Sequence, residues 1–141
     1  IEDIIEDAEG LEIKTREQGN IKSNCVLSAL GRSPNVDQLN LDKIGVEQKK
    51  NGAIVVDEFS KTNIDSVYAI GDVTDRINLT PVAIREGHAF ADTEFGNHKR
   101  SATHKNIPST VFTDPPLSTV GISSEEALKD GIEVKTFKTQ F

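Results

Sequence analysis

The segment that decides the fold runs from residue 67 to residue 96 and reads VYAIGDVTDRINLTPVAIREGHAFADTEFG. Its first four residues form an apolar run typical of a short strand, and Gly71-Asp72 ends that strand. Thr80 is a favourable N-cap, and Pro81 suits the first position of the helix that follows. In open α/β sheets, ligands bind where strands end and helices begin, because free backbone N–H groups point there. The segment therefore predicts a ligand site at Asp72 and Thr80.

The helix is predicted from Pro81 to Phe95 by the strongest periodicity in the sequence. One stripe combines Ile84, His88, Ala91 and Phe95, with Ala83, Gly87 and Phe90 beside it, while Arg85, Glu86 and Asp92 are expected to point elsewhere. Gly87 inside a helix costs about 1 kcal/mol relative to Ala, which indicates a close approach to the backbone there. Gly96-Asn97 is expected to close the helix with a left-handed cap.

Residues 1–31 predict a small sheet. Strands are expected at residues 3–7, 11–16 and 25–30, with turns at Glu9-Gly10 and Gln18-Gly19-Asn20. Pro34 disfavours a helix directly after the last of these strands, so a boundary is expected near residue 34. Residues 35–51 have the composition of a loop with at most one helical turn.

The remaining segments alternate between strand and helix patterns. Strands are expected at residues 53–57, 109–113, 117–122 and 132–137. Ser123 and Glu126 have the spacing of a capping box before a short helix, Glu125 to Lys129, which Asp130-Gly131 ends. The pattern as a whole is typical of an α/β protein with α+β character towards its end.

Composition excludes several classes of function. A net charge of −7 and a pI near 4.9 disfavour a nucleic-acid surface, which needs clustered cations. No apolar stretch approaches the ~20 residues of a transmembrane helix, and a cytoplasmic location is expected. The single cysteine, Cys25, rules out an intrachain disulfide or a multi-cysteine zinc site, and its apolar surroundings predict a buried structural thiol. The chain does not begin with Met, and we expect it to be part of a longer protein.

Several short motifs together resemble the flavin-dependent pyridine-nucleotide disulfide oxidoreductases, and within that family the glutathione reductases most closely. The motifs are YAIGD at residues 68–72, LTPVA at 79–83, LGRSPN at 30–35, FTDPP at 112–116 and TVG at 119–121. The resemblance covers essentially the whole chain. It implies that residues 1–34 end an NADPH-binding domain, that 35–104 form the central FAD-site segment with one main helix, and that 105–141 begin an α+β interface domain for homodimerisation.

The resemblance also implies which residues bind the cofactors. Asp72, with Gly71, would bind the ribityl or pyrophosphate part of FAD, and the helix start at Leu79, Thr80 and Pro81 would face the flavin ring. Gly31 would lie near the nicotinamide of NADPH, with the backbone at Asn78 and the strand at Thr110 as lesser contacts.

Two departures from the family pattern affect the expected function. The redox-active cysteine pair and the catalytic histidine of the family correspond to positions outside these 141 residues, so no catalytic residue is assigned. His88 stands where glutathione reductases commonly carry an Arg that contacts a glutathione carboxylate. A neutral imidazole binds a carboxylate more weakly than the fixed charge and bidentate fork of Arg.

Three alternatives therefore stay open beside reduction of glutathione disulfide. Trypanothione reductase matches the same motifs and lacks the substrate Arg, whereas dihydrolipoyl dehydrogenase matches the helix start less well. The alternative of another class is a non-catalytic α/β binding or dimerisation module. For these 141 residues by themselves, no stable FAD binding is expected, because part of the pocket would be missing.

Overall fold

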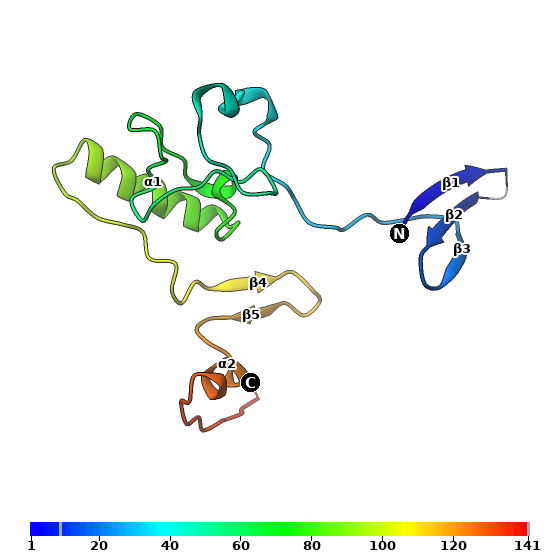
Figure 1. Cartoon of the computed structure of the whole chain (residues 1–141). Coiled ribbons are helices and arrows are strands. Elements are labelled where there is room, and N and C mark those ends of the chain that lie inside the picture. Colours follow the sequence, from blue (N-terminus) through cyan, green and yellow to red (C-terminus); the bar gives the residue numbers. More distant parts are fainter. Residues whose placement is uncertain (9, 141) are drawn as a thin grey trace. The chain divides into compact units, whose positions relative to one another are not determined.

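The computed structural model describes residues 1–8 and 10–140 (Figure 1). The chain divides into two compact units, Ile1–Arg32 and Ser33–Phe141. No helix among the described residues has the length and apolar character that crossing a bilayer requires. Each unit is described below by itself.

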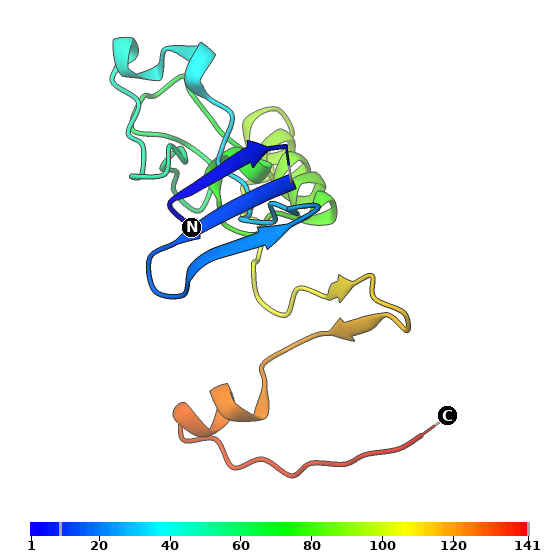
Figure 2. The same ribbon diagram turned by 90° about the vertical axis from the view of Figure 1, so that its right-hand side faces the viewer.

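The first unit is a three-stranded antiparallel sheet, coloured blue in Figure 2. β1 (Asp3–Asp7) pairs with β2 (Gly10–Thr15), which pairs with β3 (Gly19–Ser23). The two predicted strands at residues 3–7 and 11–16 are confirmed to within one residue, and the turn predicted at 18–20 lies two residues earlier, at 16–18. Gly19 and Asn20 already belong to β3, with Gly19 opposite Thr15. The predicted turn at Glu9-Gly10 falls partly on Glu9, which lies outside the described residues.

The strand predicted at residues 25–30 is wrong. That segment has neither helix nor strand, and Leu27 and Leu30 are almost fully exposed. Cys25 is exposed as well, so the expectation of a buried thiol is also wrong. An apolar run becomes a strand only when a neighbouring strand pairs with its backbone, and the sheet of this unit ends at β3.

The second unit is centred on a small apolar core. Its buried side chains are Val36, Leu41, Val46, Ile54 and Ala69. Two short 3₁₀ turns lie in this part of the chain, Asp37–Leu39 and Leu41–Ile44, as expected for a loop with little helix. The second supplies Leu41 to the core, whereas the first has no buried residue. The strands predicted at 53–57 and 67–70 shrink to single bridges, Gln48 with Ile54 and Lys61 with Tyr68. Their backbones bond to loops instead, for example Ile54 N–H to the Val73 carbonyl at 2.9 Å.

The main helix of the second unit is α1, Thr80–Glu94. Its extent agrees with the prediction to one residue, but its buried face does not. Val82, Glu86 and Ala89 are buried, whereas the predicted stripe of Ile84, His88, Ala91 and Phe95 is exposed throughout. The helix therefore turns its small and acidic side chains inward.

Two glycine predictions for α1 can be compared with the structure. A β-carbon on Gly87 would lie 3.4 Å from Cδ1 of Ile70, so a side chain lies against this backbone, at a distance that leaves room for a β-carbon. The left-handed cap expected at Gly96-Asn97 is formed by Asn97, which has φ 53°. Phe95 is the C-cap, and the His98 N–H bonds to the Asp92 carbonyl at 3.1 Å.

The last segments of the chain form a hairpin and a short helix. β4 (Ser109–Val111) pairs antiparallel with β5 (Leu117–Thr119), so both predicted strands exist but are shorter. α2 (Ser124–Lys129) begins at the predicted capping box, in which Ser123 and Glu126 bond reciprocally. The strand predicted at 132–137 is wrong, because that segment finds no pairing partner among the described residues.

Candidate cofactor site

The Gly71–Thr74 turn packs directly against the first half of α1. Gly71 has φ 70°, in the left-handed region that favours glycine. A β-carbon on Gly71 would lie 3.0 Å from Cβ of Ala83, closer than side chains normally approach. The strand end and the helix start predicted from the sequence are therefore in contact, and only glycine fits at this point.

The start of α1 has no side-chain cap. The N-cap is Leu79, and Thr80 is already the first helical residue, so the prediction of Thr80 as N-cap is wrong by one position. Pro81 lies in the first turn, where its missing N–H costs little. Pro81 has no N–H, and the Val82 N–H bonds to the Leu79 carbonyl at 2.9 Å. The start of α1 therefore offers the Thr80 N–H and the positive end of the helix dipole, which favour an oxygen-rich or anionic ligand.

Asp72 places a carboxylate on the same turn as Gly71. Its side chain is exposed, and within the described part of the chain it makes neither a hydrogen bond nor an ion pair. An exposed carboxylate without a protein partner is free to accept hydrogen bonds from ligand hydroxyl groups.

Glu86 is the buried acidic residue beneath this turn, with only 1% of its surface exposed. The Gly71 N–H donates to its Oε2 at 2.6 Å. Its Oε1 lies 2.9 Å from Nη2 of Arg76 and 2.6 Å from Nε2 of His104. A buried carboxylate is tolerated only when it is paired and hydrogen-bonded, and Glu86 meets both conditions.

Arg76 extends this network to the loops around the core. Its Nε donates to Oγ1 of Thr74 at 3.2 Å, and its Nη2 donates to Oγ of Ser60 at the same distance. The Thr74 hydroxyl in turn donates to the Gly71 carbonyl at 2.8 Å. Both backbone polar groups of Gly71 are thus held by side chains, which fixes the turn that carries Asp72.

The sequence analysis missed Glu86, Arg76 and His104. A signal for Glu86 existed, because Val82, Glu86 and Ala89 have the spacing i, i+4 and i+7 of one helical face. A count of apolar residues favours the stripe through Ile84 and Phe95 instead, because the charged Glu86 makes the buried face look more polar. Nothing local in the sequence indicated His104, which lies 18 residues from its partner.

Asp75, the residue after the turn, is held by two amides. It has φ 45° and accepts from Nδ2 of Asn78 at 3.0 Å and from Nδ2 of Asn51 at 2.7 Å. The hydrogen bonds from Asn78 and Asn51 hold the pKa of the Asp75 carboxyl below its ordinary value, with the Lys49 charge adding to them. The Asn78 side chain therefore orders the link between the turn and α1.

The remaining predicted cofactor residues lie apart from this turn in the sequence. Gly31 belongs to the first unit, where it has φ 90° and open space around its α-carbon. Thr110 is exposed on β4, with its Oγ1 2.9 Å from Oγ of Ser118. The structure brings together Gly71, Leu79 and Pro81 with their neighbours Asp72 and Thr80.

His88, the predicted substrate residue, is exposed on α1 and lines a cavity of about 180 Å³. Arg85 and Arg100 line the same cavity, together with Ala89 and residues 101–103. Arg100 is paired with Asp92 at 2.9 Å. Arg85 is the cation of this lining for which the described part of the chain shows no ion pair, and its charge suits an anionic group.

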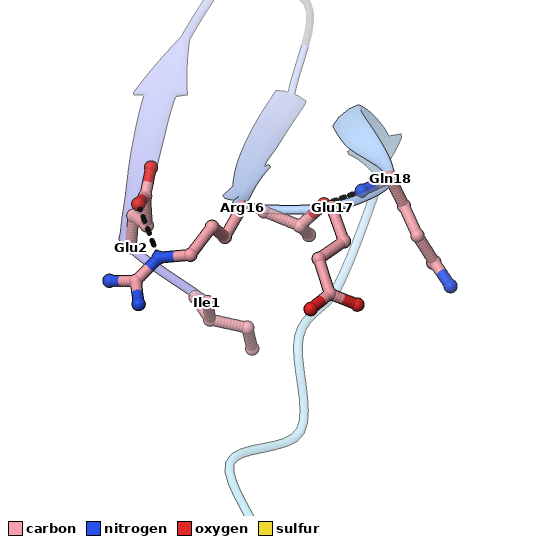
Figure 3. A pocket seen from close by; sticks show the side chains of 6 residues that line it. Ile1, Glu2, Arg16, Glu17 and Gln18 are labelled. Atoms are coloured by element: carbon pink, nitrogen blue, oxygen red, sulfur yellow. Dashed lines mark hydrogen bonds and ion pairs between the residues drawn. The ribbon is translucent and has the colours of Figure 1, made fainter.

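A larger hollow of about 420 Å³ lies in the first unit (Figure 3). Its lining includes the ion pair of Arg16 and Glu2 at 3.1 Å, and the Gln18 N–H donates to the Thr15 hydroxyl there. These groups are exposed and already paired with one another. The hollow contains none of the predicted site residues.

Two sequence families match the chain. The family described as pyridine nucleotide-disulphide oxidoreductase matches residues 1–87, and the dimerisation domain of the same family matches residues 107–141. The chain therefore belongs to the pyridine nucleotide-disulphide oxidoreductases.

Curated relatives of the chain include glutathione and trypanothione reductases. The chain is 46% identical to the glutathione reductase of Burkholderia cepacia over 84% of its length and 26% of that protein. It is 45% identical to the glutathione reductase of Nostoc sp. over 94% of its length and 32% of that protein. It is 47% identical to the trypanothione reductase of Trypanosoma congolense, over 84% of its length and 24% of that protein. The chain thus spans between about a quarter and a third of these relatives.

Solved structures agree with the family. The HOCl-induced flavoprotein disulfide reductase RclA from Escherichia coli superposes with a TM-score of 0.81 at 32% identity, covering 91% of this chain and 29% of that one. LpdA from Mycobacterium tuberculosis shares the fold, with a TM-score of 0.78 at 23% identity over 90% of this chain and 28% of that one. The predicted family and fold class are confirmed.

The residues around the turn fit the FAD that this family uses together with NADPH. The observations that carry the fit are the unpartnered Asp72 carboxylate, the uncapped start of α1 and the glycine backbone at Gly71. A flavin dinucleotide offers hydroxyl groups, phosphates and a ring with carbonyl oxygens, which match these three features.

Proposed function

We propose that the chain is part of an NADPH- and FAD-dependent disulfide reductase, most like glutathione reductase. The observation that carries this proposal is the contact between the Gly71–Thr74 turn and the uncapped start of α1, in a chain matched by both family regions in order. The relatives that match most of the chain include glutathione reductases.

In this proposal, Asp72 binds the ribityl or pyrophosphate part of FAD, and Leu79, Thr80 and Pro81 face the ring. The positive end of the α1 dipole favours negative charge on that ring. Bound FAD would carry electrons from NADPH towards a substrate disulfide. Gly31 lies on the NADPH side, with Asn78 and Thr110 as further contacts, and no residue of this chain is assigned a catalytic role.

The proposed domains follow the family order. Residues 1–34 end the NADPH-binding domain, residues 35–104 complete the FAD site, and residues 105–141 begin the interface through which the protein forms a homodimer. The match of the dimerisation domain to residues 107–141 supports the last assignment.

Glutathione disulfide is the proposed substrate, and trypanothione disulfide is the second candidate. The second is favoured by His88, which replaces the expected Arg, and by the 47% identity to a trypanothione reductase. Both substrates need recognition of groups at a distance from the disulfide, and the cavity beside His88 is a suitable place for such a group.

The test is oxidation of NADPH by the full-length protein with each disulfide in turn. We expect a flavin absorbance spectrum in the purified protein and turnover of glutathione disulfide. Turnover of trypanothione disulfide alone would replace the first substrate by the second. A colourless protein that does not take up added FAD would support the non-catalytic module instead.

A further inference from the structure

Glu86 connects three segments that are distant in sequence. Its carboxylate accepts from the Gly71 N–H in the turn, pairs with Arg76 after the turn, and lies 2.6 Å from Nε2 of His104. His104 lies three positions before the region that matches the dimerisation domain, residues 107–141. Glu86 is thus the common acceptor for the Gly71–Thr74 turn, which we call the cofactor turn, and for the segment that leads to the interface domain.

We infer that Glu86 is a positioning residue for the cofactor, acting through Gly71, and that His104 is its second support. The inference rests on the proposed function. Glu86 does not reach solvent, so it holds the backbone that carries Asp72 without itself touching a ligand. Fixing that backbone before binding lowers the entropy lost when a ligand is bound.

The two oxygens of Glu86 have separate tasks, which makes a conservative variant informative. Oε2 accepts from Gly71, while Oε1 faces two donors, Arg76 and His104. A glutamine at this position has one carbonyl oxygen and one NH₂ group, so it can satisfy only one side. Glu86→Gln keeps the size of the side chain and removes either the turn contact or the paired contacts.

The experiment compares Glu86→Gln and His104→Gln with the full-length wild-type protein. FAD is removed and returned by titration, and thermal unfolding is followed with and without FAD. We expect the dissociation constant of FAD to rise about tenfold in Glu86→Gln and by a smaller factor in His104→Gln, since a buried group left unpaired is costly. The increase in melting temperature on FAD addition should shrink accordingly.

The matched control is Glu125→Gln on α2, which removes an exposed ion pair with Lys129 at 3.0 Å. FAD affinity should be unchanged in this variant, because exposed pairs contribute little. If Glu86→Gln lowers the melting temperature equally with and without FAD and leaves the dissociation constant unchanged, Glu86 is only structural and the inference is wrong. A wild-type protein that binds no FAD would overturn the proposed function and this inference with it.

Discussion

Gly71 and Ala83 touch across the junction of the Gly71–Thr74 turn and α1, at a distance where a β-carbon on Gly71 would stand 3.0 Å from that of Ala83. The contact sets how closely the turn can approach the helix. It also explains the small residues on this side of the helix, because a larger side chain at either position would push the turn away.

Gly71→Ala is expected to destabilise the protein in two ways. Left-handed backbone costs a non-glycine residue about 1–2 kcal/mol, and the clash with Ala83 adds about 1–3 kcal/mol. Gly45→Ala is the control, since Gly45 has φ 73° but open space around it. Denaturant unfolding should show a larger loss for Gly71→Ala, and equal losses would refute the clash.

Gly87→Ala should have the opposite effect on stability. Gly87 lies inside α1, where alanine is favoured by about 1 kcal/mol, and its new β-carbon would meet only the flexible end of Ile70 at 3.4 Å. Ile70 is partly exposed and has room to move. We expect an increase of about 0.5–1 kcal/mol in the free energy of unfolding, and a decrease would show that Ile70 is held rigidly.

Arg76→Ala should cost far more stability than Arg16→Ala, although both remove an arginine–glutamate pair. The Arg76–Glu86 pair is 2.9 Å long with Glu86 buried, and the Arg16–Glu2 pair is 3.1 Å long and exposed. Removing one partner of a buried pair costs about 3–5 kcal/mol, against about 1 kcal/mol or less at the surface. Chemical denaturation of both variants measures the difference, and similar losses would contradict the role assigned to burial.

Asp75 gives a prediction for pH. Its folded-state pKa is lowered from the ordinary value of 3.8 by the Asn78 and Asn51 amides, so its contribution to stability is complete above that value. The contribution is lost as the pH falls through the lowered pKa. Asn78→Ala and Asn51→Ala should each raise the pKa of Asp75, as measured by NMR titration. An unchanged titration in both variants would contradict the hydrogen-bonded arrangement.

His88→Arg tests the substrate assignment. A fixed charge beside the cavity should lower the KM for glutathione disulfide about tenfold and leave kcat unchanged, because a hydrogen bond to a charged group contributes about 1.5–3 kcal/mol. Ala91→Arg serves as the control, since Ala91 is exposed on the same helix but does not line the cavity. An equal effect of both variants would indicate general electrostatic attraction.

Local patterns predicted the helices of this chain well. α1 and α2 were found from their periodicity, the proline of the first turn and the capping box, all of which act within a few residues. The first two strands were found for the same reason, because alternation and a turn define a hairpin. The segments at 25–30 and 132–137 have strand composition, but pairing depends on a neighbour that local sequence does not specify.

The sequence predicted the contact of the Gly71-Asp72 turn with the helix start, but not the side chains that support this turn. The approach of Gly71 to the helix start follows from residues close in sequence, whereas the buried face of α1 depends on what packs against it. From the sequence alone a charged residue such as Glu86 is expected at the surface. Its burial is explained only by its contacts with Gly71, Arg76 and His104 in the folded chain. Periodicity can place Glu86 on a helical face, but the partners of its carboxylate depend on tertiary contacts that local sequence does not specify.

The spacing of the Glu86 partners has a consequence for synthesis on the ribosome. Gly71 and Arg76 emerge before Glu86, so the turn can dock as soon as the helix has left the exit tunnel. His104 emerges 18 residues later, and until then the buried carboxylate lacks one of its side-chain partners. The support beneath the Gly71–Thr74 turn is therefore completed only when His104 has also left the exit tunnel, by which time translation has passed into the dimerisation region.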